Sequence, residues 1–301
     1  MIRDILTTFS VSGSEKKVRQ LLIESLKDKF DQVCTDCLGN VIAKKGVSQK
    51  LLVECGMDSP GIMVVDNSDG KVWFSAFGGL KPKGLIGKKI IFENSFCSEV
   101  KYDGEKSDDA KISDLYIDAD STKISIGDFG ILNHEFTEDS ESYFGYGLKS
   151  RAGLLAVYQA VQDVAGDFAV LFSAQKRIGG KGIKAFLGEN SFARVITVDA
   201  LCEKKDGGGA GIVAKDSTAV ASVNLRKALE DTAKAKKIDA KTVVSDENFF
   251  GSSFLTSGSG ADWTGIGVLV EKTEDGKEKL CKKDFENSVR LLKSAIEKLS
   301  L

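Results

Sequence analysis

The chain has 301 residues, 42% of them apolar, and its 42 Lys and Arg nearly balance 44 Asp and Glu, giving a net charge of −2. This length supports a large core or two domains, and the charge balance argues against nucleic acid as the main partner, which needs clustered surplus cations. No apolar run approaches the roughly 18 residues of a membrane span, and Met1-Ile2-Arg3-Asp4 lacks the basic start and apolar stretch of a secretion signal. We therefore expect a cytoplasmic protein without a membrane or nucleic-acid partner.

Two scarce residue types restrict the chemistry further. The six cysteines fit a reduced compartment, and the C-x-x-C at Cys34 and Cys37 precedes a strand and has no second pair, so we expect two structural thiols. The single histidine, His134, nearly excludes a zinc site built on several imidazoles. It lies apart from the other candidate residues, so we interpret it as a surface or structural histidine.

The first half of the chain predicts a helix, then two strands, and then a region of different composition. Ser12 and Glu15 have the spacing of a capping box, and apolar residues at helical spacing then predict a helix over 13–30. Residues 32–45 and 51–55 have strand composition. From about 65 to 144, short β-rich runs (71–77, 88–93 and 124–126) alternate with Gly- and Asp-rich turns, which predicts a separate small β domain.

After Gly147 helices alternate with buried strands again. We expect helices over 152–164, 180–188, 221–236 and 284–300, and strands over 168–172 and 195–198. Such alternation predicts a three-layer α/β domain. Its two pieces, 1–64 and 145–301, flank the inserted β domain, 65–144.

Asp58 and Asp199 stand at positions where a ligand would bind. Asp58 follows one predicted buried strand, and Asp199 ends another. In an open α/β sheet, carboxylates at the C-terminal ends of strands line the crevice that holds ligands. Position alone leaves a functional and a structural role open for both.

A series of short motifs extends along nearly the whole chain: Ser12-Gly13-Ser14-Glu15, Asp36-Cys37-Leu38-Gly39-Asn40, Cys55-Gly56-Met57-Asp58-Ser59-Pro60-Gly61-Ile62-Met63, Phe77-Gly78-Gly79, Leu115-Tyr116-Ile117-Asp118, Ile126-Gly127-Asp128, Leu148-Lys149-Ser150-Arg151-Ala152-Gly153, Gln175-Lys176-Arg177-Ile178-Gly179, Val198-Asp199 and Ser259-Gly260-Ala261-Asp262. In this order the motifs resemble the glutamyl-aminopeptidase and tetrahedral-aminopeptidase family of two-metal exopeptidases, some of which are named endoglucanases. There the third motif contains H-M-D-E-x-G-F-M-V, and the last four motifs read L-D-N-R-A-G, Q-E-E-V-G, V-D and G-G-T-D.

The resemblance implies both a fold and an activity. Active members release N-terminal residues from peptides with two divalent metals, Zn or Co, and assemble through their inserted domain. The chain is therefore expected to have a three-layer α/β/α aminopeptidase-type domain with an inserted small β-barrel-like domain. A homo-oligomer, or a mixed oligomer with an active paralogue, is expected from the same resemblance.

At the metal site the sequence departs from the family. Active members hold the metals with a histidine, a bridging aspartate, a glutamate, a second aspartate and a final histidine. Matched by position, the first four ligands fall in that order on Gly56, Lys149, Arg177 and Asp199, so only Asp199 is retained. The final histidine falls within 270–279, which contains no histidine, and Glu274 is the best placement for it. The general-base glutamate falls on Lys176, whereas the aspartate two residues after the first histidine survives as Asp58.

These replacements predict a site without resident metals. Lysine and arginine bring positive charge to the places of dications, and an arginine side chain stays protonated and cannot donate a lone pair. Without metals, Asp58 and Asp199 would be partly buried carboxylates that need compensation. We predict that Lys149 and Arg177 form a salt-bridge cluster with these two aspartates in place of the dinuclear centre.

The leading interpretation is a family member without peptidase activity that acts as a binding, scaffold or regulatory protein. One alternative is an active metallo-aminopeptidase with a rearranged metal site. Another is a module that binds an anionic small molecule or a peptide carboxylate through Lys149, Lys176 and Arg177. Other hydrolase chemistry is disfavoured, because no nucleophile and base pair is evident in the sequence.

Overall fold

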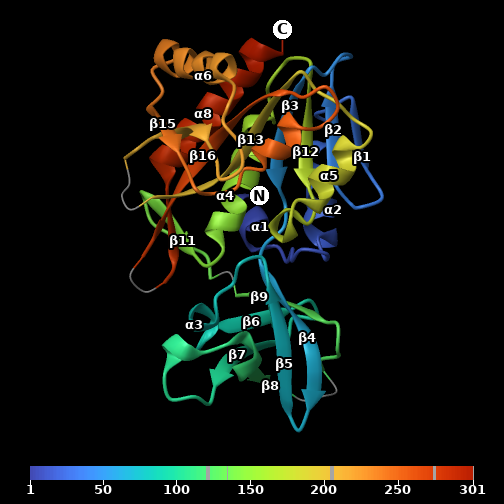
Figure 1. Ribbon diagram of the computed structural model, residues 1–301, viewed down its shortest axis with the longest axis vertical. Helices are drawn as coiled ribbons and strands as arrows, with labels where there is room; N and C mark the ends of the chain where they lie inside the picture. The colour runs from blue at the N-terminus through green and yellow to red at the C-terminus, as the bar shows by residue number, and fades with distance from the viewer. Residues whose placement is uncertain (120–122, 134, 204–206, 274–275, 301) are drawn as a thin grey trace.

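A mixed sheet of eleven strands runs through the larger part of the molecule (Figure 1). The structure is a computed structural model that describes residues 1–119, 123–133, 135–203, 207–273 and 276–300. In spatial order the main path of the sheet is β1 (Gln32–Thr35), β2 (Val41–Lys45), β12 (Phe168–Ser173), β3 (Leu51–Gly56), β13 (Arg194–Glu203), β16 (Asp262–Lys272), β17 (Glu278–Cys281), β11 (Ser142–Gly145) and β10 (Thr137–Glu138). Off this path, β14 (Ala210–Lys215) pairs with β16, and β15 (Ala240–Val244) pairs with β14. The central neighbours β12, β3, β13 and β16 are parallel, so their C-terminal ends share one edge.

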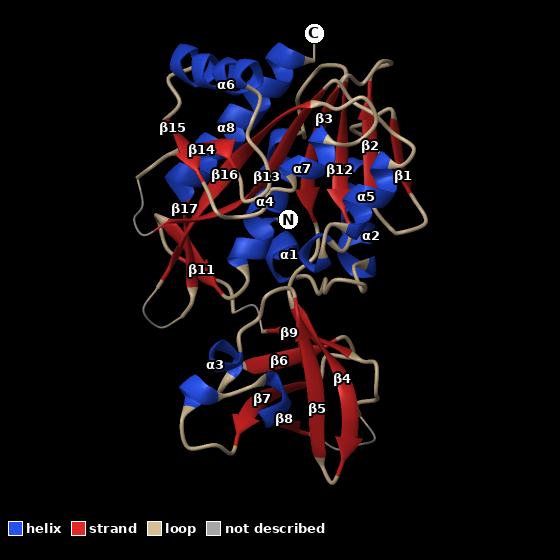
Figure 2. Cartoon of the chain, in the orientation of Figure 1, coloured by secondary structure: helices blue, strands red, loops and turns tan. Residues whose placement is uncertain are grey.

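Helices cover both faces of this sheet, because alternate side chains of each strand point to opposite sides. In β2, Val41 and Ala43 belong to one buried cluster and Ile42 to a second cluster on the other face. The first cluster is closed by α1 (Ile2–Thr7), α2 (Lys16–Leu26), α4 (Leu148–Ala160), α6 (Val223–Ala235) and α8 (Lys282–Leu299). The second is closed by α5 (Lys181–Leu187) and α7 (Gly251–Leu255), as Figure 2 shows. The predicted three-layer α/β/α architecture is confirmed.

A closed β-barrel forms the smaller part of the molecule, below the sheet in Figure 1. It has its own buried cluster and carries the short helix α3 (Pro82–Leu85) and the 3₁₀ turns η1 (Ser107–Asp109) and η2 (Ile112–Asp114). Around the barrel the strands are β4 (Gly61–Ser68), β5 (Lys71–Phe77), β8 (Leu115–Asp118), β7 (Cys97–Tyr102), β6 (Lys89–Phe92) and β9 (Phe129–Leu132).

The barrel strands lie within 61–132, which differs from the expected insert boundaries of 65–144. β4 already begins directly after Pro60, before the composition changes. At the other end, β10 and β11 pair within the large sheet, where β11 is antiparallel to β17. Both segments are short, and the partner that joins β11 to the large sheet, β17, follows more than 130 residues later, so the sequence does not show this pairing.

Two local predictions were wrong. Ser12 does not cap a helix: α2 begins at Lys16, with Glu15 at its N-cap, and Ser12 Oγ instead donates to Asp58 Oδ2 over 2.5 Å. The Glu15 carboxylate accepts from the Gly13 and Gln175 amides, both over 2.9 Å. The expected strand at 124–126 is a loop and turn. Ser12 and Glu15 therefore attach the N-terminal segment to the loops that carry the candidate site.

Three further sequence expectations concern the cysteines, the histidine and membrane spans. Cys34 and Cys37 are free thiols, as are the four other cysteines. His134 lies outside the described residues. Across the part of the chain that the structure describes, no helix has both the length and the apolar character needed to cross a membrane.

Helix α4 lies unusually close to the sheet at Gly153. A Cβ atom at this position would be 2.7 Å from the Val198 carbonyl oxygen and 3.0 Å from the Asp199 Cα atom. Both are backbone atoms of β13, which cannot move without disturbing the strand. The glycine therefore sets the spacing between α4 and the strand that carries Asp199.

We expect the substitution Gly153→Ala to lower the free energy of unfolding by about 1–2 kcal/mol, because overpacking outweighs the gain in helix propensity. Urea unfolding followed by circular dichroism measures this. Gly84→Ala is the matched control: its Cβ would meet nothing within 4 Å, so its effect should stay within about 0.5 kcal/mol of zero or be stabilising. Equal stability of the two variants would contradict the close packing.

Candidate functional site

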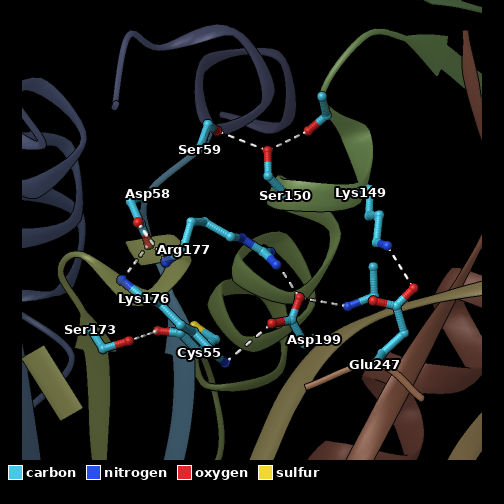
Figure 3. Close-up of polar contacts among 12 residues, drawn as sticks. Cys55, Asp58, Ser59, Lys149, Ser150, Ser173, Lys176, Arg177, Asp199 and Glu247 are labelled. Atoms are coloured by element: carbon cyan, nitrogen blue, oxygen red, sulfur yellow. Dashed lines mark hydrogen bonds and ion pairs between the residues drawn. The ribbon is translucent and has the colours of Figure 1, made fainter. Parts of the chain in front are cut away.

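The candidate site lies at the C-terminal edge of the parallel strands (Figure 3). Asp58 follows β3, and Lys176 and Arg177 lie in the 3₁₀ turn η3 (Lys176–Ile178) that follows β12. Asp199 lies in β13, and Lys149 in the first turn of α4. The topology thus brings together segments that are more than 100 residues apart in the sequence.

Asp199 is the acceptor at the centre of the site. Its Oδ1 atom accepts from Arg177 Nη2 over 2.9 Å and from the Ala200 amide over 2.8 Å, and its Oδ2 atom lies 3.3 Å from Lys176 Nζ. Burial raises the pKa of the Asp199 carboxyl, but the charges of Arg177 and Lys176 outweigh burial and hold it below its ordinary value. Asp199 is therefore an ionised carboxylate between two cations.

Lys176 is completely buried and lies between two carboxylates. Its Nζ atom donates to Glu54 Oε2 over 3.0 Å, and Glu54 Oε1 accepts from Ser173 Oγ over 2.7 Å. Neither Lys176 nor Glu54 has exposed surface. Burial lowers the pKa of Lys176, but Glu54 and Asp199 outweigh it and raise the pKa above its ordinary value. For Glu54 burial dominates, so its pKa is raised despite the nearby Lys176 charge.

Asp58 is buried as well, but it is held by backbone groups rather than by a cation. Its carboxylate accepts from the amides of Lys176 and Arg177 over 3.0 and 2.9 Å, and from Ser12 Oγ over 2.5 Å. No side-chain ion pair to Asp58 occurs among the described residues. The carboxylate of Asp58 therefore fixes the conformation of the η3 turn and so the directions of the two basic side chains.

Lys149 pairs with a glutamate rather than with either aspartate. Its Nζ atom forms an ion pair with Glu247 Oε1 over 2.6 Å, and its amide donates to Glu278 Oε2 over 2.7 Å. The predicted cluster of Asp58, Lys149, Arg177 and Asp199 is therefore only partly correct. Arg177 does pair with Asp199, whereas Lys176, Glu54 and Glu247 complete the charge network in place of the expected partners (Figure 3).

Gly56 and Lys176 depend on each other. A Cβ atom at Gly56 would lie 2.7 Å from Lys176 Cδ and 3.0 Å from Lys176 Cβ. The aliphatic stem of the lysine thus fills the space that any side chain at position 56 would need. Glu274, the expected counterpart of the last family histidine, lies outside the described residues.

The residues present do not fit a dinuclear metal centre. Position 56 offers no donor, position 149 carries a cation that is paired elsewhere, and Asp199 is engaged by Arg177 and Lys176. In the described ranges, no group of three or more His, Cys, Asp or Glu side chains is arranged to hold a metal ion. Each metal of such a centre needs several convergent donors and a shared bridge, and these side chains instead neutralise one another.

A cleft of about 430 Å³ opens beside the charge network, between the barrel and the large sheet. Gly78 and Gly79 come from the end of β5, and Lys149, Arg177, Glu247 and Glu278 come from the α/β part. Gly78 has φ of +74°, and a Cβ there would lie 2.8 Å from the Cα atom of Pro60. Only glycine fits this close turn, which lets the barrel approach the site.

Sequence reasoning missed Glu54, Glu247 and Glu278. Glu54 carried a usable signal, because it is the one charged residue in the run Leu-Leu-Val-Glu-Cys and such a residue needs a buried partner. Glu247 had no such signal, since it lies in the loop between β15 and α7. Glu278 is only four residues from Glu274, the expected counterpart of the last family histidine.

The comparisons by sequence and by structure agree, because the relatives that they find are named aminopeptidases or peptidases. Residues 39–291 match the sequence profile of M42 glutamyl aminopeptidases. A protein of Acetivibrio thermocellus that is named an aminopeptidase is 30% identical over 324 residues, covering 97% of this chain and 98% of its own. An aminopeptidase structure from the archaeon Desulfurococcus kamchatkensis has a TM-score of 0.89 at 18% identity, covering 99% of this chain and 93% of its own. The TET1 peptidase of Pyrococcus horikoshii, which can assemble into a tetrahedron or a large octahedral shell, has a TM-score of 0.87 at 21% identity and coverage of 98% and 99%.

The buried network predicts that Lys176→Met lowers the free energy of unfolding strongly and in a pH-dependent way. The change leaves Glu54 without a cation, and we expect a loss of about 3–5 kcal/mol in the free energy of unfolding at pH 8. Because the pKa of Glu54 is then raised further above its unfolded value, the folded state takes up a proton as the pH falls. The loss should therefore be smaller at pH 5.5 than at pH 8, as measured by urea unfolding at both values.

Two variants control this experiment. In Lys176→Met combined with Glu54→Gln, no uncompensated carboxylate remains at position 54, so much of the stability should return and the pH dependence should disappear. Lys184→Met removes a lysine from the exposed surface of α5, and it should change stability by less than about 0.5 kcal/mol. A loss for Lys176→Met that is the same at both pH values would contradict the assigned pairing.

Proposed function

The chain belongs to the M42 glutamyl aminopeptidase family, and from this premise we propose that it has lost the metal pair and the peptidase activity and works as a binding, scaffold or regulatory protein. The observation that carries the proposal is the position of Lys176. This ammonium group is fully buried between Glu54 and Asp199, and its stem fills the space beside Gly56. Two dications and this ammonium group would repel one another at the same carboxylate.

The proposal assigns different tasks to the surviving family residues. Asp199 balances charge instead of binding metal, and Asp58 holds the η3 turn through its backbone amides. Lys176 offers no general base, because its pKa is raised and its ammonium group is paired with Glu54 and Asp199. The alternative of a rearranged metal site is less well supported, since Glu247 and Glu278 are both engaged by Lys149. A cytoplasmic location remains part of the proposal.

Metal content and peptidase activity test this proposal directly. After incubation with excess Zn²⁺ or Co²⁺ and desalting, elemental analysis should find far less than one metal per chain. The chromogenic p-nitroanilides of leucine and glutamate should release no product above the blank. The TET1 peptidase of Pyrococcus horikoshii, treated in the same way, checks that the assay detects activity. A value near two metals per chain with turnover of either substrate would refute the proposal.

We also propose that the chain forms oligomers through its barrel, with itself or with an active paralogue. The assembly of the TET1 peptidase of Pyrococcus horikoshii supports the general idea. On this chain, Val65 and Ile126 are apolar residues with 51% and 68% of their surface exposed. They adjoin each other, because the Gly127 amide donates to the Val64 carbonyl over 2.9 Å. Burying these two apolar side chains against another copy of the barrel would be favourable.

Light scattering after size-exclusion chromatography should therefore give a mass above the 32.4 kDa of one chain. The substitution Ile126→Lys should lower the measured mass, because burying an ammonium group in the contact is unfavourable. Val47→Lys is the matched control, since Val47 is 94% exposed on the α/β part, and it should leave the mass unchanged. A monomer for the unaltered protein would end this part of the proposal.

A further inference from the structure

The cleft between the barrel and the α/β part is positively charged, although the whole chain is not. Its lining contains four cations, Lys81, Lys149, Arg177 and Lys272, and two carboxylates, Glu247 and Glu278. Four positive and two negative groups give the lining a formal charge of +2, against −2 for the complete chain. Low-dielectric walls on both sides concentrate such a field within the cleft.

Part of this positive charge is not neutralised by protein groups. Lys149 is paired with Glu247, and Arg177 uses Nη2 on Asp199, while its Nε atom has no hydrogen-bond partner. Lys81 and Lys272 are exposed, and within the described residues neither side-chain ammonium group has a hydrogen bond or an ion pair. Burial raises the pKa of Glu278, the strand partner of Lys272 across β16 and β17, although the charges of Lys149, Lys272 and Arg177 act to lower it.

The other walls of the cleft suit a short peptide. Pro60, Leu80 and Leu132 give an apolar side, and the backbone of Gly78 and Gly79 borders the opening. At Gly79 nothing lies within 4 Å of the place of a Cβ atom, so its backbone is open to a neighbour. The volume of about 430 Å³ is in the range of small-ligand sites.

We infer that this cleft binds short peptides by their carboxylate end and disfavours their amine end. The inference rests on the proposed function, because dications at Asp199 would displace the pairing of Arg177 and change the field in the cleft. A carboxylate matches the guanidinium and ammonium groups of the lining in charge and in hydrogen-bond geometry. A free ammonium group meets the same cations as like charges. Lys176, which was expected to take part, is buried between Glu54 and Asp199 and lines only an adjoining hollow of about 320 Å³, which shares Arg177 and Glu247 with the cleft.

Two peptides with the same side chains and opposite charge test the inference by calorimetry. N-acetyl-Leu-Ala-Leu carries only a free carboxylate, and Leu-Ala-Leu amide carries only a free amine. The acetylated acid should bind with a saturable signal at 50 mM NaCl, at least tenfold more tightly than the amide. Its affinity should fall at 500 mM NaCl, because salt screens the contribution of the exposed lysines.

Substitutions then locate the site on the full-length protein. Lys81→Gln and Lys272→Gln should each weaken binding of the acetylated acid by about two- to fivefold, as expected for exposed charge pairs. Both residues lie on the surface, so folding should be unaffected, and circular dichroism checks this. Lys227→Gln removes an exposed lysine of α6 at a distance from the cleft lining, and it should bind like the unaltered protein.

Each remaining outcome contradicts the inference. Equal or tighter binding of the amide would show that the cleft does not select the carboxylate end. Absence of saturable binding by either peptide would show that the cleft is not a peptide site, and equal losses in all three variants would show a diffuse charge effect. None of these results depends on metal content. A failure of the proposed function would be seen in a separate experiment, as two metals per chain together with peptidase turnover.

Discussion

Buried carboxylates need a compensating positive charge, and this requirement organises the whole site. Glu54, Asp58 and Asp199 stand at the C-terminal edge of parallel strands, where the fold offers little solvent. Lys176 and Arg177 supply the charge for Glu54 and Asp199, and two backbone amides and a hydroxyl satisfy Asp58. Because Asp58 holds the turn that carries both cations, the three carboxylates act as one unit.

The fold could be predicted because the relevant signals are local or repeated along the chain. Helical periodicity, buried strands and the order of motifs were enough for the three-layer architecture and the family, which are both confirmed. The insert boundary was wrong because β11 finds its partner, β17, only in the three-dimensional structure. Ser12 was misread for a similar reason, since its hydroxyl bonds to a residue 46 positions away rather than to its own helix.

The site was predicted in part, and its geometry explains which contacts could be predicted from the sequence and which could not. The pair of Arg177 and Asp199 was predicted because both residues fall on metal-ligand positions of the family that the sequence resembles, after β12 and within β13. The direction of Lys149 depends on Glu247, which lies 98 residues later in a loop of no distinct pattern. The fold survives such replacements because both large apolar clusters lie on the faces of the sheet rather than at the edge that carries the charges. Family membership therefore establishes the architecture here, while the chemistry depends on a few residues.

The contact between Gly56 and Lys176 makes the two positions interdependent. A histidine at position 56 would need the space that the lysine stem occupies. Replacing the lysine alone would leave Glu54 and Asp199 with one cation fewer in a buried place. Either single substitution is therefore unfavourable, and only a joint change of both positions would make room for a metal-binding side chain at position 56.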